Sequence, residues 1–352
     1  SDTEKEIFIN NIRQEYEKTR SRLANSDSKP LLDLKSANNN KFQFDWETYQ
    51  PPIPKFLGEK QIKNINLNEI IDYIDWTIFF RSWDLAGQFP KILDDEVVGS
   101  AASNLYKDAL AMLKRLENEN FFDLEAVIGF WPAFQENENE VCILDEFKKD
   151  EVAKLNFLRQ QKPQGIRPNL CLADFIKPGN FEKNDYIGAF AVSAGRNVEE
   201  RCKEFEENND DYSSIMLKAI ADRLAEALAE YIHERVRKDF WGYSENENFT
   251  NEELIKEKYL GIRPAPGYPA CPDHSEKVKL FKLLNEDKLV DISLTENFAM
   301  YPAASVSGWY FSHPDSKYFG VGKIGDDQVK FIAESRKEPI ELTKKYLRPN
   351  LD

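Results

Sequence analysis

The segment "GIRPAPGYPACPDH", residues 261–274, places reactive side chains on an unusually stiff backbone. It holds four prolines and two glycines beside an arginine, a tyrosine, a cysteine and a histidine. Proline fixes φ and removes a backbone donor, while Gly267 would let the chain approach a ligand closely. This pattern suits a rigid ledge beneath a flat heterocycle, with Arg263 placed to bind a carboxylate through two N–H groups. A surface loop stiffened by prolines is the alternative.

Other short motifs are compatible with chemistry but lack the residues to complete it. Cys271 and His274 could form half of a metal site, yet the chain has only three histidines and no second cluster of sulfur or imidazole. "SHPDS" (312–316) is too compact for a catalytic triad and is typical of a tight turn. "GVGKIG" (320–325) fits a dinucleotide motif, but too little chain follows it for the required second strand and acidic residue. We therefore expect no bound metal, no triad and no phosphate loop.

Two carboxylates stand in contexts that are unusual for a solvated charge. Asp75 lies within "YIDWTIFFRSW" (73–83), where the aromatic rings favour core packing. A charge in such surroundings needs a partner from the protein or from a ligand. Glu226 lies among alanines on a predicted long helix, and a solvated helix face explains it equally well.

Composition limits the class of partner. The net charge is −15, and no concentrated run of Lys and Arg offsets it. Such a surface repels phosphate backbones and anionic lipids, so we expect neither nucleic-acid nor membrane binding. The four cysteines show no paired spacing, which favours a cytoplasmic setting. A protein or a small molecule is the expected partner.

Periodicity predicts a mixed α+β fold with an antiparallel sheet flanked by helices. Strands are expected at 126–134, 140–145 and 186–195, and two more within 304–322, joined by the turn. Helices are expected near 67–80, 103–117 and 213–238. The last has a core stripe of Leu217, Ile220, Leu224, Leu228 and Ile232, and a polar side of Asp222, Glu226 and His233.

The N-terminal region differs from the rest of the chain. Its first part is an amphipathic pattern with a sparse apolar face, and a polar stretch broken by proline follows. Residues 1–42 are therefore interpreted as a helix and linker. Residues 43–352 are expected to form a single domain.

Several long blocks together resemble the C-terminal activation domain of cobalamin-dependent methionine synthase. They include "IDWTIFF", "LADFIKP", "DYIGAFAV", "ADRLAEALAEYIHERVRK" and "SVSGWYFSHPDSKYF", and the resemblance covers roughly residues 43–350. It implies a C-shaped domain built on a bent antiparallel sheet. Residues 1–42 would then tether this domain to a preceding cobalamin-binding domain.

The resemblance also implies a site for S-adenosylmethionine (AdoMet). The family's Arg-x-x-x-Gly-Tyr signature stands here as Arg263, Gly267 and Tyr268, so the stiff segment would be the AdoMet ledge. Arg263 would bind the methionyl carboxylate and Asp75 the ammonium group, while Tyr268 would lie near the methyl group and the cobalt. Asp222 would face the cobalamin domain. The remaining implied AdoMet neighbours are Glu226, Ala265, Tyr318 and Phe319, the last of which offers only its ring or backbone.

The implied reaction is reductive reactivation within methionine biosynthesis. An electron from flavodoxin or a similar donor reduces cob(II)alamin, and AdoMet then supplies the methyl group that restores methylcobalamin. The parent chain would be the 5-methyltetrahydrofolate–homocysteine methyltransferase, and this fragment, expected to be monomeric, would not turn over alone. A docking module without AdoMet binding is the main alternative. An independent methyltransferase would need an acceptor site and usually a base, and neither is visible.

Overall fold

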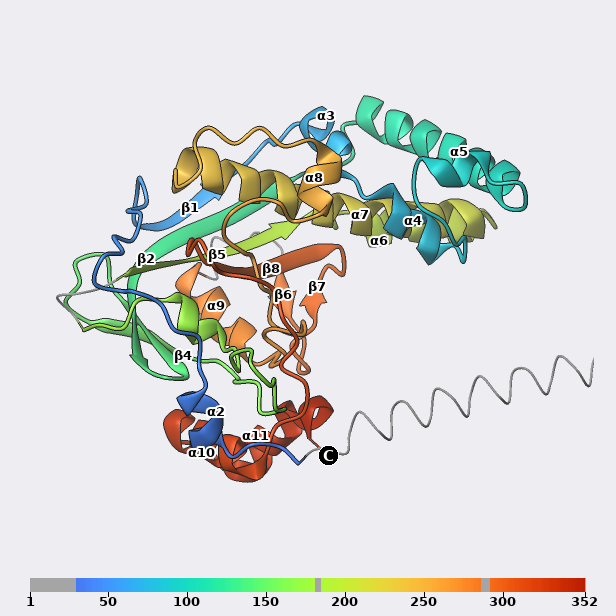
Figure 1. Ribbon diagram of the computed structural model, residues 1–352. Coiled ribbons are helices and arrows are strands. Elements are labelled where there is room, and N and C mark those ends of the chain that lie inside the picture. The colour runs from blue at the N-terminus through green and yellow to red at the C-terminus, as the bar shows by residue number, and fades with distance from the viewer. Residues whose placement is uncertain (1–29, 181–184, 286–291, 352) are drawn as a thin grey trace, which may run out of the picture. The chain divides into compact units, whose positions relative to one another are not determined.

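The computed structural model describes residues 30–180, 185–285 and 292–351 (Figure 1). The described residues form two compact units. The larger comprises residues 44–158, 171–180, 185–285 and 292–319, and the smaller comprises residues 30–43, 159–170 and 320–351. The helix expected in the first part of the chain lies outside the described residues.

The larger unit is built on an antiparallel sheet with the order β4-β3-β2-β5-β8, in which β1 also pairs with β2. The central pair β2–β5 runs in register from Glu125 opposite Ser193 to Ala133 opposite Asp185. β1 and β3 share the other edge of β2, toward its two ends. The strands are β1 (Gly58–Ile62), β2 (Glu125–Asn137), β3 (Glu140–Leu144), β4 (Glu151–Asn156), β5 (Asp185–Ser193) and β8 (Ser305–Tyr310), with a separate small pair β6 (Ser293–Leu294) and β7 (Met300–Tyr301).

Both faces of the sheet are covered. Every residue of β5 and of β8 is buried, so apart from Asp185 at the start of β5 these strands consist of apolar, aromatic or small residues instead of alternating with polar ones. Figure 1 shows α7 on one side of the sheet and α9 on the other, and both helices contact β5 and β8. The helices of this unit are α3 (Leu67–Ile70), α4 (Trp76–Ser82), α5 (Gly99–Asn118), α6 (Val198–Glu207), α7 (Asp211–Arg235), α8 (Asn251–Ile255) and α9 (Glu276–Leu283).

The mixed fold and its antiparallel sheet are confirmed, and so are the strands expected near 126–134, 140–145 and 186–195. The core stripe of α7 is also buried as predicted. His233, however, was expected on the polar side and is completely buried. It stacks on Tyr310 at 5.2 Å between ring centroids, and Tyr259 meets its ring edge-on.

Two expected elements differ from the structure. The helix near 67–80 is interrupted at Ile74 and Asp75, whose backbones are extended, because the Asp75 side chain caps the start of α4. The second strand predicted within 304–322 is absent from the described sheet. After β8 and the turn at His313, the chain leaves the sheet, and Tyr318 contacts the backbone of Arg263 instead.

The smaller unit contains α2 (Leu34–Asn39), α10 (Asp326–Arg336) and α11 (Ile340–Tyr346). The part of the expected linker that is described thus forms a helix, with Asp33 as its N-cap and with Leu34 and Ala37 buried. Residues 320–325 form a loop before α10. No helix in the described ranges combines the length and apolarity that crossing a membrane requires.

Candidate functional site

The proline-rich segment lies along the edge of β8. Ile262 exchanges two backbone hydrogen bonds with Phe311, each 3.0 Å long, and the carbonyl of Pro264 accepts one from Trp309 N–H at 2.9 Å. The Tyr318 hydroxyl accepts another from the backbone N–H of Arg263. The segment is therefore attached to the sheet edge and held at a fixed position beside α7. The Pro264 carbonyl is already used within the protein.

A cavity of about 450 Å³ lies against this ledge. Its floor and walls are largely apolar, and Arg263 and two glutamates supply the charge. Six of the residues that the resemblance assigned to AdoMet line it. The lining comprises Glu226, Glu257, Arg263, Pro264, Ala265, Tyr268, Pro269, Ala270, Val306, Tyr318 and Phe319.

A second, more polar cavity of about 210 Å³ shares Glu226, Glu257 and Arg263 with the first. Asp75 lines this second cavity. Its Oδ1 accepts hydrogen bonds from Thr77 N–H at 2.9 Å and Ile78 N–H at 3.4 Å, which is the geometry of a helix N-cap. Its Oδ2 makes no hydrogen bond to the described residues, so the carboxylate keeps an acceptor for a ligand. The backbone N–H groups at the start of α4 thus provide a partner for one oxygen of the Asp75 carboxylate.

Arg263 lines both cavities and is held by a glutamate of α7. Its Nη2 lies 2.9 Å from Oε2 of Glu230, whereas its Nη1 lies 4.0 Å from Oε2 of Glu226. Glu230 was missed at the sequence level. The spacing of Glu226 and Glu230, one helical turn apart on α7, was the available signal, because residues four apart share a helix face.

The local electrostatics favour a ligand with positive charge. Four carboxylates and two arginines line the smaller cavity, namely Asp75, Glu226, Glu230, Glu257, Arg223 and Arg263. Burial raises the pKa of Glu257, while the positive charge of Arg263 opposes that effect. The carboxylate of Glu226 raises the pKa of Tyr268, whose hydroxyl lies 3.5 Å from Glu226 Oε1. Tyr268 remains 55% exposed at the rim of the larger cavity.

Two predicted residues lie outside these cavities. Gly267 has φ 101°, and a Cβ there would come within 2.2–2.7 Å of the His274 ring. Glycine is required at this position by backbone conformation and by His274; close approach of a ligand stays a prediction. Asp222 lines a separate cavity of about 160 Å³, one helical turn before Glu226, and pairs with Arg223.

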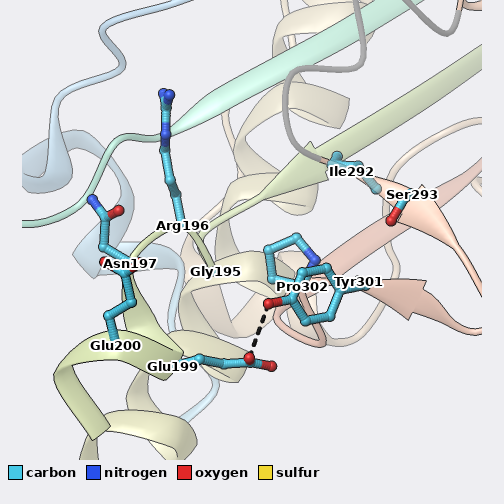
Figure 2. A pocket seen from close by; sticks show the side chains of 9 residues that line it. All are labelled: Gly195, Arg196, Asn197, Glu199, Glu200, Ile292, Ser293, Tyr301 and Pro302. Atoms are coloured by element: carbon cyan, nitrogen blue, oxygen red, sulfur yellow. Dashed lines mark hydrogen bonds between the residues drawn. The ribbon is translucent and has the colours of Figure 1, made fainter. Parts of the chain in front are cut away.

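Another cavity, of about 430 Å³, contains none of the predicted site residues. Figure 2 shows Tyr301 pointing toward Glu199, and their hydrogen bond is 2.9 Å long. Arg196, which also lines this cavity, is paired with Asp123. This lining lacks the combination of an apolar ledge and a partly buried arginine that is found beside α7.

Comparison with known proteins identifies the family. Residues 66–337 match the family described as "Vitamin B12 dependent methionine synthase, activation domain". A solved structure described as "Crystal Structure of the MetH Reactivation Domain bound to AdoHcy" is 48% identical, with a TM-score of 0.88, and the match covers 92% of this chain and 99% of that chain. The chain therefore belongs to the family of vitamin B12-dependent methionine synthase activation domains.

Proposed function

We propose that this chain binds AdoMet in the two neighbouring cavities that share Arg263. Its role there would be to supply the methyl group for the reductive methylation of cob(II)alamin, which is held by a cobalamin-binding domain of the same parent chain. The observation that carries the proposal is the pairing of an apolar cavity with a carboxylate-rich one, with Arg263 at their boundary. AdoMet has the same division into an adenosine end and a zwitterionic methionyl end.

The residues present fit such a ligand. Pro264, Ala265, Val306 and Phe319 offer the apolar surface that an adenine ring needs. The Nε of Arg263 is buried and has no hydrogen-bond acceptor among the described residues, so the guanidinium retains donor capacity for a carboxylate. Asp75 Oδ2 can accept from the ammonium group. The relative with 48% identity is described as bound to AdoHcy, which supports this assignment.

The protein's contribution to methyl transfer would be positioning. The transition state disperses the positive charge of the sulfonium, so a carboxylate pressed against it would stabilise the ground state more than the transition state. Asp75 therefore serves as an anchor for the ammonium group. Tyr268, at the exposed rim, is the residue we place nearest the reacting methyl group, and Asp222 faces the cobalamin domain. Holding the donor in line with its acceptor then supplies the rate advantage.

The remaining steps require partners. Flavodoxin or a similar donor supplies the electron, and the cobalamin domain supplies the acceptor. The parent chain is proposed to be the methionine-forming methyltransferase of the cytoplasm. The present chain is proposed to be a monomer that does not catalyse the reaction by itself. Residues 1–42 are proposed to link the fragment to the cobalamin domain.

Calorimetric titration of AdoMet into the chain tests the proposal. Saturable binding is expected, and Arg263→Ala should weaken it by about tenfold to a hundredfold, because a charge-assisted hydrogen bond is lost. Arg115→Ala, which removes an exposed arginine paired with Glu119 on α5, is the matched control and should bind normally. Absence of binding by the unmodified chain would favour the alternative, a docking module without AdoMet.

A further inference from the structure

We propose that Glu230 is a positioning residue, which fixes the Arg263 guanidinium in the orientation that receives the ligand's carboxylate. Arg237 forms a longer ion pair with Glu230 and is itself bound by Glu247. This inference rests on the proposed function, because it concerns how the same site recognises the methionyl end of its ligand. Glu230 itself lines the smaller cavity, and Arg237 and Glu247 lie outside the linings of both cavities.

The contact between Glu230 and Arg263 is short and nearly enclosed. Glu230 is 8% exposed, and its Oε2 accepts from Nη2 of Arg263 at 2.9 Å. Glu226, the other α7 carboxylate near Arg263, is 4.0 Å away at its closest. Of the two glutamates, Glu230 therefore determines where the guanidinium lies. Its contact occupies Nη2 and leaves Nε and Nη1 for another acceptor.

Glu230 is itself supported from behind. Its Oε1 lies 3.7 Å from Nη1 of Arg237, a fully buried arginine. Arg237 donates from Nε to both carboxylate oxygens of Glu247, at 2.8 and 2.9 Å, and its guanidinium lies 4.1 Å from the centroid of the Tyr259 ring. Arg237 belongs to the π-helical turn Val236–Phe240 that follows α7. The wider turn alters the direction of its side chains relative to a regular helix.

The network places the Glu230 carboxylate between the partly buried guanidinium of Arg263 and the fully buried guanidinium of Arg237. His233 lies close to both arginines, and burial, together with their charges, holds the pKa of His233 well below its usual range. It therefore adds no third positive charge. A buried ion pair is weak evidence for added stability, because desolvation offsets much of its attraction. Orientation of Arg263 is a role that such a network can perform, since a long flexible side chain otherwise loses entropy when it binds a carboxylate.

A purely electrostatic view makes the opposite prediction for the same residue. The carboxylate of Glu230 beside Arg263 partly neutralises it, so removing that negative charge would strengthen the attraction of Arg263 for a ligand carboxylate. If Glu230 positions Arg263, its removal instead frees the guanidinium to turn toward Glu226. Binding then weakens. The direction of the change in affinity thus separates positioning from simple charge.

The test compares two ligands on the isosteric variant Glu230→Gln. S-adenosylhomocysteine (AdoHcy) carries the amino and carboxylate groups that Arg263 and Asp75 are proposed to bind, and 5′-deoxy-5′-methylthioadenosine lacks both groups. In metal sites, loss of a residue that orients a ligating side chain typically lowers the affinity by about ten- to a hundredfold. By analogy, we expect loss of the Glu230 carboxylate to raise the Kd for AdoHcy by about tenfold or more. The Kd for methylthioadenosine should change by less than about twofold, because its recognition does not involve Arg263. Glu276→Gln removes another buried glutamate, paired with Lys279 and lining none of the cavities above, and should leave both affinities unchanged.

Three results would overturn the proposal. They are unchanged AdoHcy binding, tighter AdoHcy binding, and an equal loss for both ligands in a folded variant. If Glu230→Gln does not fold, Glu247→Gln probes the same network from its far end and should give a smaller loss with the same difference between ligands. Failure of the unmodified chain to bind either ligand would instead reject the proposed function, and the inference with it.

Discussion

The hydroxyl of Tyr318 accepts a hydrogen bond from the backbone N–H of Arg263 at 2.9 Å, across 55 positions of sequence. One aromatic residue of the cavity wall therefore holds the backbone of the residue that we assign to the ligand carboxylate. The wall and the ledge are expected to act as one rigid piece.

Replacement of Tyr318 by phenylalanine should weaken this connection. The N–H of Arg263 loses its acceptor, and we expect a loss of about 1–3 kcal/mol in the free energy of unfolding, with a several-fold rise in the Kd for AdoMet. Chemical denaturation and calorimetric titration measure the two effects. Tyr301→Phe removes a hydroxyl that bonds Glu199 in a different cavity and should leave the Kd unchanged. An unaltered Kd in Tyr318→Phe would contradict the rigid wall.

Gly267→Ala should destabilise the ledge through two separate costs. The φ of 101° strains any side chain, and the new Cβ would meet the His274 ring. We expect a loss of roughly 2–4 kcal/mol in unfolding free energy. Gly322→Ala provides the matched control, because Gly322 has φ 73° and open space around its Cβ position, so only the backbone cost applies.

A double-mutant cycle separates these costs at Gly267. His274→Ala removes the ring that the new Cβ would meet, so Gly267→Ala should be less costly in that background. The coupling energy, measured by denaturation of the four proteins, is expected to be about 1 kcal/mol or more. Strictly additive effects would show that the His274 ring moves aside without cost.

Asp75→Asn should separate the two contacts of the Asp75 carboxylate. Asparagine is also a good N-cap, so the start of α4 and the thermal midpoint should be preserved. The Kd for AdoMet should rise by about tenfold, because a charged partner for the ammonium group is lost. Asp75→Ala should lower both the midpoint and the affinity. Normal AdoMet binding by Asp75→Asn would remove Asp75 from the ligand site.

Asp185 predicts a specific dependence of stability on pH. Burial raises the pKa of this carboxyl to about 7, although the N–H groups of Tyr186 and Lys177 donate to it and oppose that change. Between about pH 4 and 7 the folded state therefore binds more protons at this residue than the unfolded state. Its contribution is fully present below the unfolded pKa and is lost as the pH rises through the folded one. The change is on the order of 4 kcal/mol.

The measurement for Asp185 is denaturation at several pH values between 4 and 8, for the unmodified chain and for Asp185→Asn. The difference in unfolding free energy between the two proteins should change steadily across that window, in favour of the unmodified chain at low pH. Asp45→Asn is the comparison, because hydrogen bonds from Thr48 and Glu47 lower the pKa of Asp45, which is the opposite direction. A pH-independent difference for Asp185→Asn would show that its carboxyl titrates normally.

Much of the fold could be predicted from local patterns. The apolar run within β5 and the helical spacing of Leu217, Leu224 and Leu228 identified their elements, because the spacing of apolar side chains along the chain predicts which of them are buried. The helix at α2 was missed because its two buried residues stand within a polar, proline-broken stretch. The strand expected after the His313 turn was wrong, because the chain leaves the sheet there and Tyr318 contacts the backbone of Arg263, a residue 55 positions away that local patterns cannot reveal.

For the candidate site, too, some residues could be predicted from the sequence and others only from the structure. Residue types and the family resemblance were enough to single out Asp75, Arg263 and Tyr268. A proline-rich segment and a carboxylate among aromatic residues can both be recognised in the amino-acid sequence. Their roles in binding stay predictions. The sequence by itself thus determined the elements and the residues with chemical potential. Only the tertiary structure decided that Glu230 holds Arg263 and that His233 is buried against Tyr310. These contacts join α7 to segments dozens of residues away, and the spacing of residues within α7 does not reveal them.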